Sequence, residues 1–212
     1  MQEQKLVYLI MGPQGCGKGT QAKIISEKLK VPHISTGDLL RATTGKLKEE
    51  VDAYTKMGKF APDDLILEIL EKRMQEPDCR YGVMLDGFPR NMAQAHTLDS
   101  KLKVEKVISI EISDEEAVKR LSGRYNCEKC KAGYNIYTAP KPKVNGICDK
   151  CGGNLTQRDD DTSEQAIRER LSIYHSTTKP ILQHYKDRLI TIDGEQSIEK
   201  VTKDISQKLR LE

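Results

Sequence analysis

Gly12-Pro13-Gln14-Gly15-Cys16-Gly17-Lys18-Gly19-Thr20 is the stretch of sequence that decides the fold. It follows an apolar run, residues 6–11, and precedes a helix-like run, residues 21–30. A strand, a glycine loop, a lysine and a helix start form a phosphate cradle, because glycines let backbone N–H groups converge on phosphate oxygens and the helix N-terminus adds positive charge. The loop matches G-x-x-x-x-G-K, but the next position is Gly19, and the hydroxyl comes only at Thr20. The stretch predicts a triphosphate-binding protein with one departure from the general motif.

Length and composition predict one α/β domain with insertions. The chain has 212 residues, of which 37% are hydrophobic and 32% charged. The 35 basic residues nearly balance the 32 acidic ones, which argues against a dedicated nucleic-acid binder. No apolar run has membrane-spanning length, and the polar N-terminus lacks the features of a signal peptide. We therefore expect a cytoplasmic protein.

Strand-like and helix-like segments alternate along the chain. The strand-like runs are residues 6–11, 31–34, 82–85, 104–112 and 189–192. The helix-like segments are residues 18–30, 63–75, 91–102, 113–121, 163–187 and 197–211. This alternation predicts a five-stranded parallel sheet with helices on both faces, the P-loop NTPase type of α/β fold. Right-handed crossovers then bring the carboxyl ends of the strands, and the phosphate loop, to one edge.

Two stretches interrupt the alternation. Residues 35–62 contain two short helical patterns and no strand, and residues 125–161 are rich in Gly, Pro, Lys and Cys without a long period. A structureless loop as long as the second would be unusual in a compact domain. We interpret both as insertions, which divides the chain into a core of residues 1–34, 65–122 and 162–212, a first insertion of residues 35–64 and a second of residues 123–161.

Four of the six cysteines lie in the second insertion. They are Cys127, Cys130, Cys148 and Cys151, in the pattern C-x2-C-x17-C-x2-C. In a reducing compartment this spacing indicates a tetrahedral zinc site rather than two disulfides. Four thiolates leave no position open for water, so the predicted zinc is structural and supplies the cohesion that a small core lacks.

The segment Asp86-Gly87-Phe88-Pro89-Arg90 is the second strong signal. It ends an apolar strand, so Asp86 occupies a Walker-B-like position where a carboxylate holds Mg²⁺ directly or through water. Arg90 follows off the end of the strand, and its guanidinium is a planar fork for phosphate.

These motifs resemble those of the adenylate kinases. Gly-Lys-Gly-Thr at the end of the phosphate loop, Ser35-Thr36-Gly37-Asp38, the Asp86–Arg90 segment and Arg120-x-x-x-Arg124 occur here in the order typical of that family. The Gly-Lys-Gly-Thr ending is the form seen in nucleoside monophosphate kinases. The resemblance covers residues 6–211, and the insertion with four cysteines is similar to the long zinc-bearing lid of many bacterial and some archaeal members.

For the phosphate donor, the resemblance implies an ATP site that begins at the phosphate loop, residues 15–20. The further ATP contacts that it implies are Arg120, Arg124, Tyr134 and Gln196. The turn at Asp193-Gly194-Glu195-Gln196 is similar to the one whose backbone touches the adenine of ATP.

For the acceptor, the resemblance implies an AMP site formed by the first insertion and the Asp86–Arg90 segment. The implied AMP contacts are Thr36, Arg41, Lys59, Phe60, Ala61, Gly87, Phe88, Pro89, Arg90, Gln94, Arg158 and Arg170. An amide such as that of Gln94 donates and accepts at once, as an adenine edge requires. Arg170 is chosen because Arg-Leu-x-x-Tyr matches the family at residues 170–174, and Arg168 is the alternative.

The implied reaction is Mg²⁺-dependent transfer of a phosphoryl group from ATP to AMP. Phosphoryl transfer needs positioning and charge stabilisation, which we assign to Lys18, Arg90, Arg124, Arg158 and Arg170. The acceptor phosphate, with a second pKa of about 6, is largely ionised at neutral pH, so we nominate no general base and none of the four histidines. Closure of the lid excludes water, which competes as acceptor.

Two alternatives for the function stay open. One is a kinase with broader donor or acceptor choice, such as one using GTP as donor or accepting pyrimidine nucleotides. A more distant one is a zinc-ribbon nucleic-acid-binding NTPase, because lysines surround the cysteines at 129, 131, 141, 143 and 150. We expect no membrane or nucleic-acid partner. The family implies a monomer, with the trimers known from archaea as the alternative.

Overall fold

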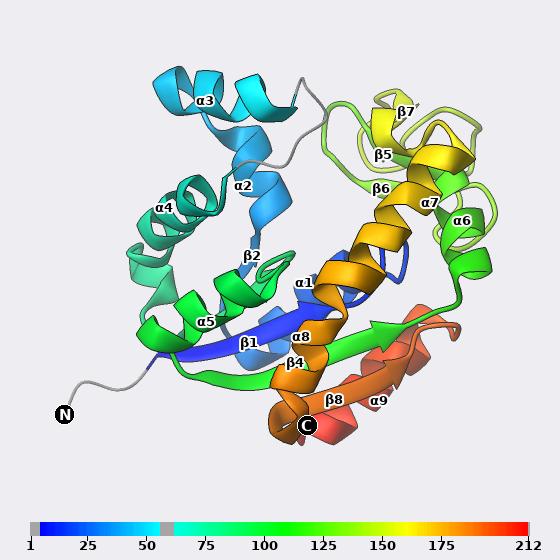
Figure 1. Ribbon diagram of the computed structural model, residues 1–212. Helices are drawn as coiled ribbons and strands as arrows, with labels where there is room; N and C mark the ends of the chain where they lie inside the picture. The colour runs from blue at the N-terminus through cyan, green and yellow to red at the C-terminus, as the bar shows by residue number, and fades with distance from the viewer. Residues whose placement is uncertain (1–4, 56–61, 212) are drawn as a thin grey trace.

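The computed structural model describes residues 5–55 and 62–211, and its centre is a five-stranded parallel sheet with helices on both faces (Figure 1). The strand order is β2-β3-β1-β4-β8. The strands are β1 (Leu6–Met11), β2 (His33–Ser35), β3 (Gly82–Asp86), β4 (Val104–Glu111) and β8 (Leu189–Asp193). The predicted α/β fold is confirmed.

The core forms on both faces of the sheet because side chains alternate along each buried strand. Val7 and Leu9 pack on one face with residues of α4 (Asp63–Met74), α5 (Met92–Lys101) and α8 (Pro180–His184). Ile10 packs on the other face with residues of α1 (Lys18–Leu29) and α9 (Ile198–Leu209). Strands that are buried on both faces read as continuous apolar runs, as these do.

The long helix predicted over residues 163–187 is interrupted. It consists of α7 (Glu164–Ile173), a π-helical turn over Tyr174–Thr178, α8, and a 3₁₀ turn over Lys186–Arg188. In the π turn the Lys179 N–H donates to the Tyr174 carbonyl, five residues back, at 2.8 Å. Pro180 is the physical reason, since its ring has no N–H and clashes with the carbonyl four residues earlier in a regular α-helix.

The first insertion is helical where the structure describes it. It contains α2 (Thr36–Ala42), whose N-terminus is capped by the Ser35 side chain, and α3 (Gly45–Thr55). Both short helical patterns of the sequence therefore correspond to helices. A 3₁₀ turn, Pro77–Cys79, leads from α4 into β3.

The second insertion follows α6 (Asp114–Ser122) and has regular structure that the sequence did not indicate. It forms a three-stranded antiparallel sheet in the order β6-β5-β7. The strands are β5 (Arg124–Cys127), β6 (Gly133–Asn135) and β7 (Leu155–Gln157), and a 3₁₀ turn, Asp159–Asp161, leads back to α7. Each strand has only three or four residues, too few to display an alternating pattern.

The carboxyl ends of the parallel strands lie along one edge of the sheet. The end of β1 runs into the phosphate loop, and its Ile10 is in register with Asp86 of β3. On the other side, Glu111 of β4 pairs with Asp193 of β8. Within the two described ranges, no helix combines the length and the apolar character needed to span a bilayer.

Candidate functional site

The phosphate loop has the backbone of an anion cradle. Gly12, Gly15 and Gly17 have φ values of 141°, 86° and 90°, a region that favours glycine. A Cβ at Gly12 would lie 2.3 Å from the Ile110 carbonyl oxygen, so this position also needs glycine for space. Lys18 begins α1, and its Nζ donates to the Pro13 carbonyl at 3.0 Å. The lysine therefore bends back over the loop that its backbone helps to form.

Asp86 lies beside the first turn of α1. A Cβ at Gly19 would lie in ordinary contact distance of Asp86 Oδ2, at 3.4 Å, which places the carboxylate directly beside this residue of the motif. The carboxylate is mostly buried, and His33 Nε2 lies 3.3 Å from the same oxygen. An oxygen ligand next to a phosphate cradle is suited to Mg²⁺.

Four arginines gather at the same edge of the sheet. Arg124 and Arg158 lie at the two ends of the second insertion, Arg170 on α7 and Arg90 after β3. Arg90 is exposed at the protein surface, yet desolvation, together with the charges of Arg158, Arg41 and Arg170, lowers the pKa of its guanidinium. Asp86 acts on Arg90 in the opposite direction, so the guanidinium also lies within electrostatic reach of the carboxylate beside α1. Concentrated positive charge at this place suits a polyanion.

Two consecutive carboxylates hold this arginine cluster together. Asp161, whose side chain is fully buried, accepts from Arg124 Nε at 2.7 Å and from Arg170 Nη1 at 2.9 Å. Asp160 accepts from Arg158 at 2.9 Å with each of its two oxygens. The carboxylates offset the repulsion between guanidinium groups and fix their forks side by side.

The structure distinguishes between the two arginines proposed for α7. Arg170 bonds to both Asp160 and Asp161 and so joins the cluster. Arg168 instead donates to Glu164 one helical turn back, at 2.8 Å, on the exposed side of α7. Only Arg170 is brought together with the other predicted phosphate contacts.

Arg90 and Gln94 form one unit. Gln94 Oε1 accepts from the Arg90 backbone N–H at 2.7 Å, and Gln94 Nε2 donates to Asp63 Oδ1 at 2.6 Å. The amide is buried and engaged within the protein, so reading an adenine edge requires it to exchange Asp63 for the base. Arg90 Nε donates to the Gly87 carbonyl at 2.8 Å, which points the fork back toward β3.

Thr36 and Arg41 lie on α2, at the start of the first insertion. Thr36 is buried, and its hydroxyl donates to the Gly87 carbonyl at 2.9 Å. Arg41 is exposed and pairs with Asp38 at 2.5 Å. The predicted contacts Lys59, Phe60 and Ala61 lie outside the described residues.

Arg120 and Gln196 meet the same turn on the far side of the phosphate loop. Arg120 Nη2 donates to the Gly194 carbonyl at 2.9 Å, and its Nε donates to Glu116 at 2.8 Å. Gln196 Nε2 donates to the Asp193 carbonyl at 2.9 Å. The turn after β8 is thereby tied to α6 next to the phosphate loop.

The four cysteines of the second insertion converge. Their sulfur atoms all lie within 4.8 Å of one another, with 3.4 Å between Cys127 and Cys151 and 3.5 Å between Cys130 and Cys148. A tetrahedral zinc with Zn–S bonds of about 2.3 Å separates its sulfurs by about 3.8 Å. The thiolate set therefore fits zinc in both donor chemistry and size.

Tyr134 faces this cysteine cluster rather than the arginines. It is buried, with its hydroxyl 3.5 Å from Cys148 Sγ and accepting from the Asp149 N–H at 2.9 Å. It therefore packs inside the second insertion in this conformation. Its contact with ATP stays a prediction.

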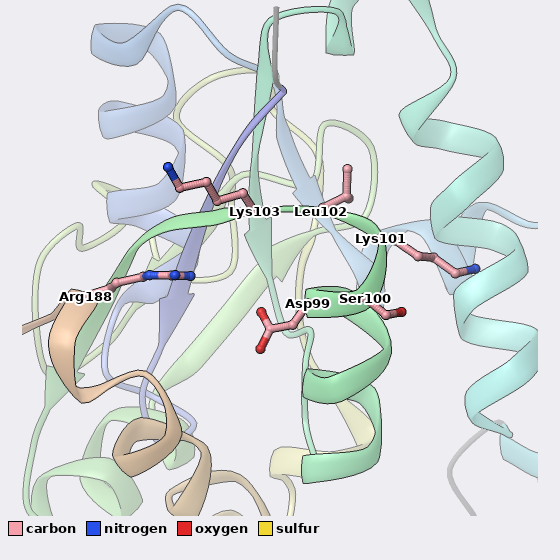
Figure 2. A pocket seen from close by; sticks show the side chains of 6 residues that line it. All are labelled: Asp99, Ser100, Lys101, Leu102, Lys103 and Arg188. Atoms are coloured by element: carbon pink, nitrogen blue, oxygen red, sulfur yellow. The ribbon is translucent and has the colours of Figure 1, made fainter.

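One surface hollow lies away from the predicted site residues. It has a volume of about 440 Å³ and is lined by Asp99, Ser100, Lys101, Leu102, Lys103 and Arg188 (Figure 2). It lies where α5 leads into β4, at the amino end of that strand. The phosphate loop lies at the opposite edge of the sheet, where the parallel strands end. Figure 2 shows Lys101 directed away from Asp99, and Lys101 pairs with Glu71 of α4. None of the predicted site residues lines it.

Sequence reasoning missed three contributors to the site edge. His33 touches Asp86, and the signal was available, because neighbouring parallel strands end at the same edge. Asp160 and Asp161 belong to a run of three aspartates, residues 159–161. Both lie in the 3₁₀ turn Asp159–Asp161, and their positions in the sequence do not indicate which arginines they bind.

Comparison with known proteins agrees with this geometry. The sequence model of the family described as "Adenylate kinase" matches residues 10–190. A protein named "Adenylate kinase" from Methanocella arvoryzae is 46% identical over 213 residues, which cover 96% of this chain and 98% of that protein. Proteins of the same name from Archaeoglobus fulgidus and Caldicellulosiruptor saccharolyticus are 44% and 41% identical, covering 93% and 96% of this chain and 94% and 99% of theirs.

Proposed function

The chain belongs to the adenylate kinase family, and we propose that the phosphate loop and the arginine cluster together form one active site. Its reaction is reversible Mg²⁺-dependent phosphoryl transfer from ATP to AMP, which yields two ADP. The observation that carries the assignment of residues is the gathering of Arg90, Arg124, Arg158 and Arg170 beside Asp86 and the phosphate loop. Two nucleotides that meet end to end bring several phosphate groups to one place. Clustered guanidinium groups are a matching set of charges.

The donor side begins at the loop. Residues 15–20 offer backbone N–H groups and the N-terminus of α1 to the β- and γ-phosphates of ATP, and Lys18 adds a full charge. For these contacts the lysine gives up the Pro13 carbonyl. Arg120, Arg124, Tyr134 and Gln196 complete the ATP side, with the turn after β8 beside the adenine.

The acceptor side lies around Arg90. Arg90, Arg158 and Arg170 bind the AMP phosphate, and Arg41 reaches it from α2. Thr36 supports the segment of Gly87, Phe88 and Pro89 through its bond to the Gly87 carbonyl. Gln94 turns its amide from Asp63 to the adenine edge, and Lys59, Phe60 and Ala61 contribute backbone groups.

The protein supplies charge and position rather than a base. The AMP phosphate is already largely ionised at neutral pH, with a second pKa of about 6. Lys18 and the arginines stabilise the charge that spreads over the transferred group, with donors fixed before the reaction. Asp86 would hold Mg²⁺, which would neutralise further phosphate charge when bound with ATP. Alignment of the two phosphates lowers the activation barrier by as much as any single charged contact.

In this proposal the two insertions move relative to the core. We take residues 35–64 as the AMP-binding unit, residues 123–161 as the lid, and the remainder as the core. The lid carries Arg124 and Arg158 at its two ends, so its closure brings both guanidinium groups onto the phosphates. Zinc on Cys127, Cys130, Cys148 and Cys151 keeps the short strands of the lid together while it moves.

A substrate panel tests the proposal. ADP formation is measured with ATP and Mg²⁺ against AMP, GMP, UMP and CMP, and then with GTP as the donor for AMP. We expect AMP to be the preferred acceptor by at least about a hundredfold in kcat/KM, because the buried amide of Gln94 is set to match one base edge. A comparable rate with UMP or CMP would contradict the acceptor assignment. The donor test decides whether the enzyme accepts triphosphates other than ATP.

A further inference from the structure

The π-helical turn between α7 and α8 reaches directly to Arg90. The hydroxyl of Thr178, the last residue of the turn, donates to the Arg90 backbone carbonyl at 2.9 Å. Figure 1 shows α7 and α8 as one nearly continuous rod that descends from beside the lid toward the base of the sheet. Thr178 therefore links this rod to the loop after β3, although 88 positions separate the two residues in sequence.

The turn is held firmly on either side of Thr178. Tyr174, its first residue, is almost completely buried, and Ile181 just after it is fully buried in the core. His175 Nε2 lies 2.8 Å from Asp114 Oδ1 at the start of α6. Because these anchors fix the turn on the body of the protein, the position of the Thr178 hydroxyl is also fixed.

Hydrogen bonds hold both the backbone and the side chain of Arg90. Gln94 accepts from its N–H, Gly87 accepts from its Nε, and Thr178 donates to its carbonyl. Gly87 and Gln94 lie within four residues of Arg90, in the loop after β3 and in the first turn of α5, so both contacts are local in sequence. Thr178 comes from a different element, so it fixes the loop relative to the helix that carries Arg170.

The wide turn also sets the direction in which Thr178 points. In a regular α-helix, residues eight apart diverge by about 80° around the axis, since each residue turns about 100°. The π-helical turn before Pro180 has more residues per revolution than an α-helix. The angle around the axis between Arg170 and Thr178 is therefore smaller. The Arg170 guanidinium and the Thr178 hydroxyl can therefore face the same neighbour, Arg90.

We propose that Thr178 is a positioning residue that sets the place of Arg90 relative to Arg170 through the hydrogen bond to the Arg90 carbonyl. The proposal rests on the phosphate-binding role given to the two arginines above. A displacement of about 1 Å costs up to about 100-fold in rate when reacting groups are aligned. Loss of this one bond should therefore lower kcat while the melting temperature stays nearly unchanged.

The test compares three substitutions at Thr178 with one at its neighbour. Thr178→Val keeps the shape and removes the donor, Thr178→Ser keeps the donor, and Thr178→Ala removes the hydroxyl without adding a methyl group. Thr177→Val is the matched control, because Thr177 lies in the same turn, is exposed, and donates only to the Ile173 carbonyl at 2.7 Å among the bonds described.

We expect kcat for ADP formation to fall about tenfold in Thr178→Val and Thr178→Ala, with KM for ATP changed less than twofold. Thr178→Ser and Thr177→Val should stay within twofold of the wild type, and all four melting temperatures should lie within about 3 °C of it. Wild-type kcat in both Val and Ala variants would overturn the proposal. So would equal losses in Thr178→Ser and Thr178→Val, or losses that simply follow the melting temperature. Absence of activity in the wild type would instead contradict the proposed function.

Discussion

Arg124 and Asp161 form an ion pair across the two ends of residues 123–161, the segment that we propose as the lid. The Arg124 Nε donates to Asp161 Oδ2 at 2.7 Å, and the Asp161 side chain has no exposed surface. Arg124 begins the first strand of the lid, whereas Asp161 ends the turn that leaves it. The same carboxylate holds Arg170, so one buried charge joins the lid to the helix after it.

Replacing Asp161 with Asn should destabilise the protein markedly. The change keeps the shape but leaves two guanidinium groups without their shared counter-charge. Breaking a buried pair in this way costs about 3 kcal/mol, or roughly 6–12 °C in Tm for a chain of this size. Asp78→Asn is the control, because Asp78 pairs with Arg73 but its side chain is 53% exposed, and we expect less than about 1 kcal/mol there. Equal effects of the two substitutions in thermal unfolding would contradict the structural role of Asp161.

The contribution of Asp160 should depend on pH. Burial raises the pKa of its carboxyl, but the charges of Arg158 and Arg170 outweigh burial and lower the pKa below its usual value. A lowered pKa in the folded state means that the stabilisation is complete above the unfolded pKa of about 4 and is lost as pH falls through the folded value. We expect the wild type to melt above Asp160→Asn at pH 7, with the gap closing below about pH 4. A gap that stays constant between pH 7 and pH 3 would show that ionisation of Asp160 is not its source.

Lys18→Ala should abolish nearly all turnover and leave the fold intact. In the proposed assignment the lysine places a positive charge on the transferred group, while its one side-chain bond described in the structure is to the Pro13 carbonyl. We expect kcat to fall by about a thousandfold or more, as for the loss of a strong electrostatic contact in an active site. Lys28→Ala, at the other end of α1, controls for loss of a lysine from this helix. Retention of more than a tenth of the activity would exclude Lys18 from the assigned role.

Zinc should be present at one ion per chain and should stabilise the lid more than it affects the chemistry. Replacing Cys127 with Ser removes one of four thiolates, so the variant should lose zinc and melt at a lower temperature. Cys79→Ser is the matched control, since Cys79 is a buried cysteine outside the cluster. Metal analysis and thermal unfolding measure both effects. Purified wild-type protein without zinc, or with zinc equally lost from both variants, would contradict the site.

The sequence predicts those features that depend on a local pattern of residue types. The phosphate loop could be predicted because glycines at Gly12, Gly15 and Gly17 are needed for positive φ. The convergence of the four cysteines could be predicted because their spacing is typical of zinc sites. The alternation of strands and helices gave the parallel sheet. Gly19 departs from the general motif but matches the Gly-Lys-Gly-Thr form of the nucleoside monophosphate kinases, and the structure adds that it lies beside Asp86.

Pairing between distant side chains could not be predicted in the same way. Nothing in the local sequence indicates that Asp63 binds Gln94, that Asp161 bridges Arg124 and Arg170, or that Tyr134 turns to Cys148. The π turn likewise depends on how Pro180 is accommodated between two buried anchors, whereas helical periodicity alone suggested an unbroken helix. Such features follow from tertiary packing, which a single sequence does not display.

The fate of the γ-phosphate tests the central claim most directly. The protein is incubated with Mg²⁺, AMP and ATP labelled at the γ-phosphate, and the labelled products are separated. We predict that the label appears in the β-phosphate of ADP, that two ADP form for each ATP consumed, and that omission of AMP stops the consumption of ATP. Release of the label as inorganic phosphate, at a rate that does not depend on AMP, would identify a hydrolytic NTPase and contradict the two-nucleotide site.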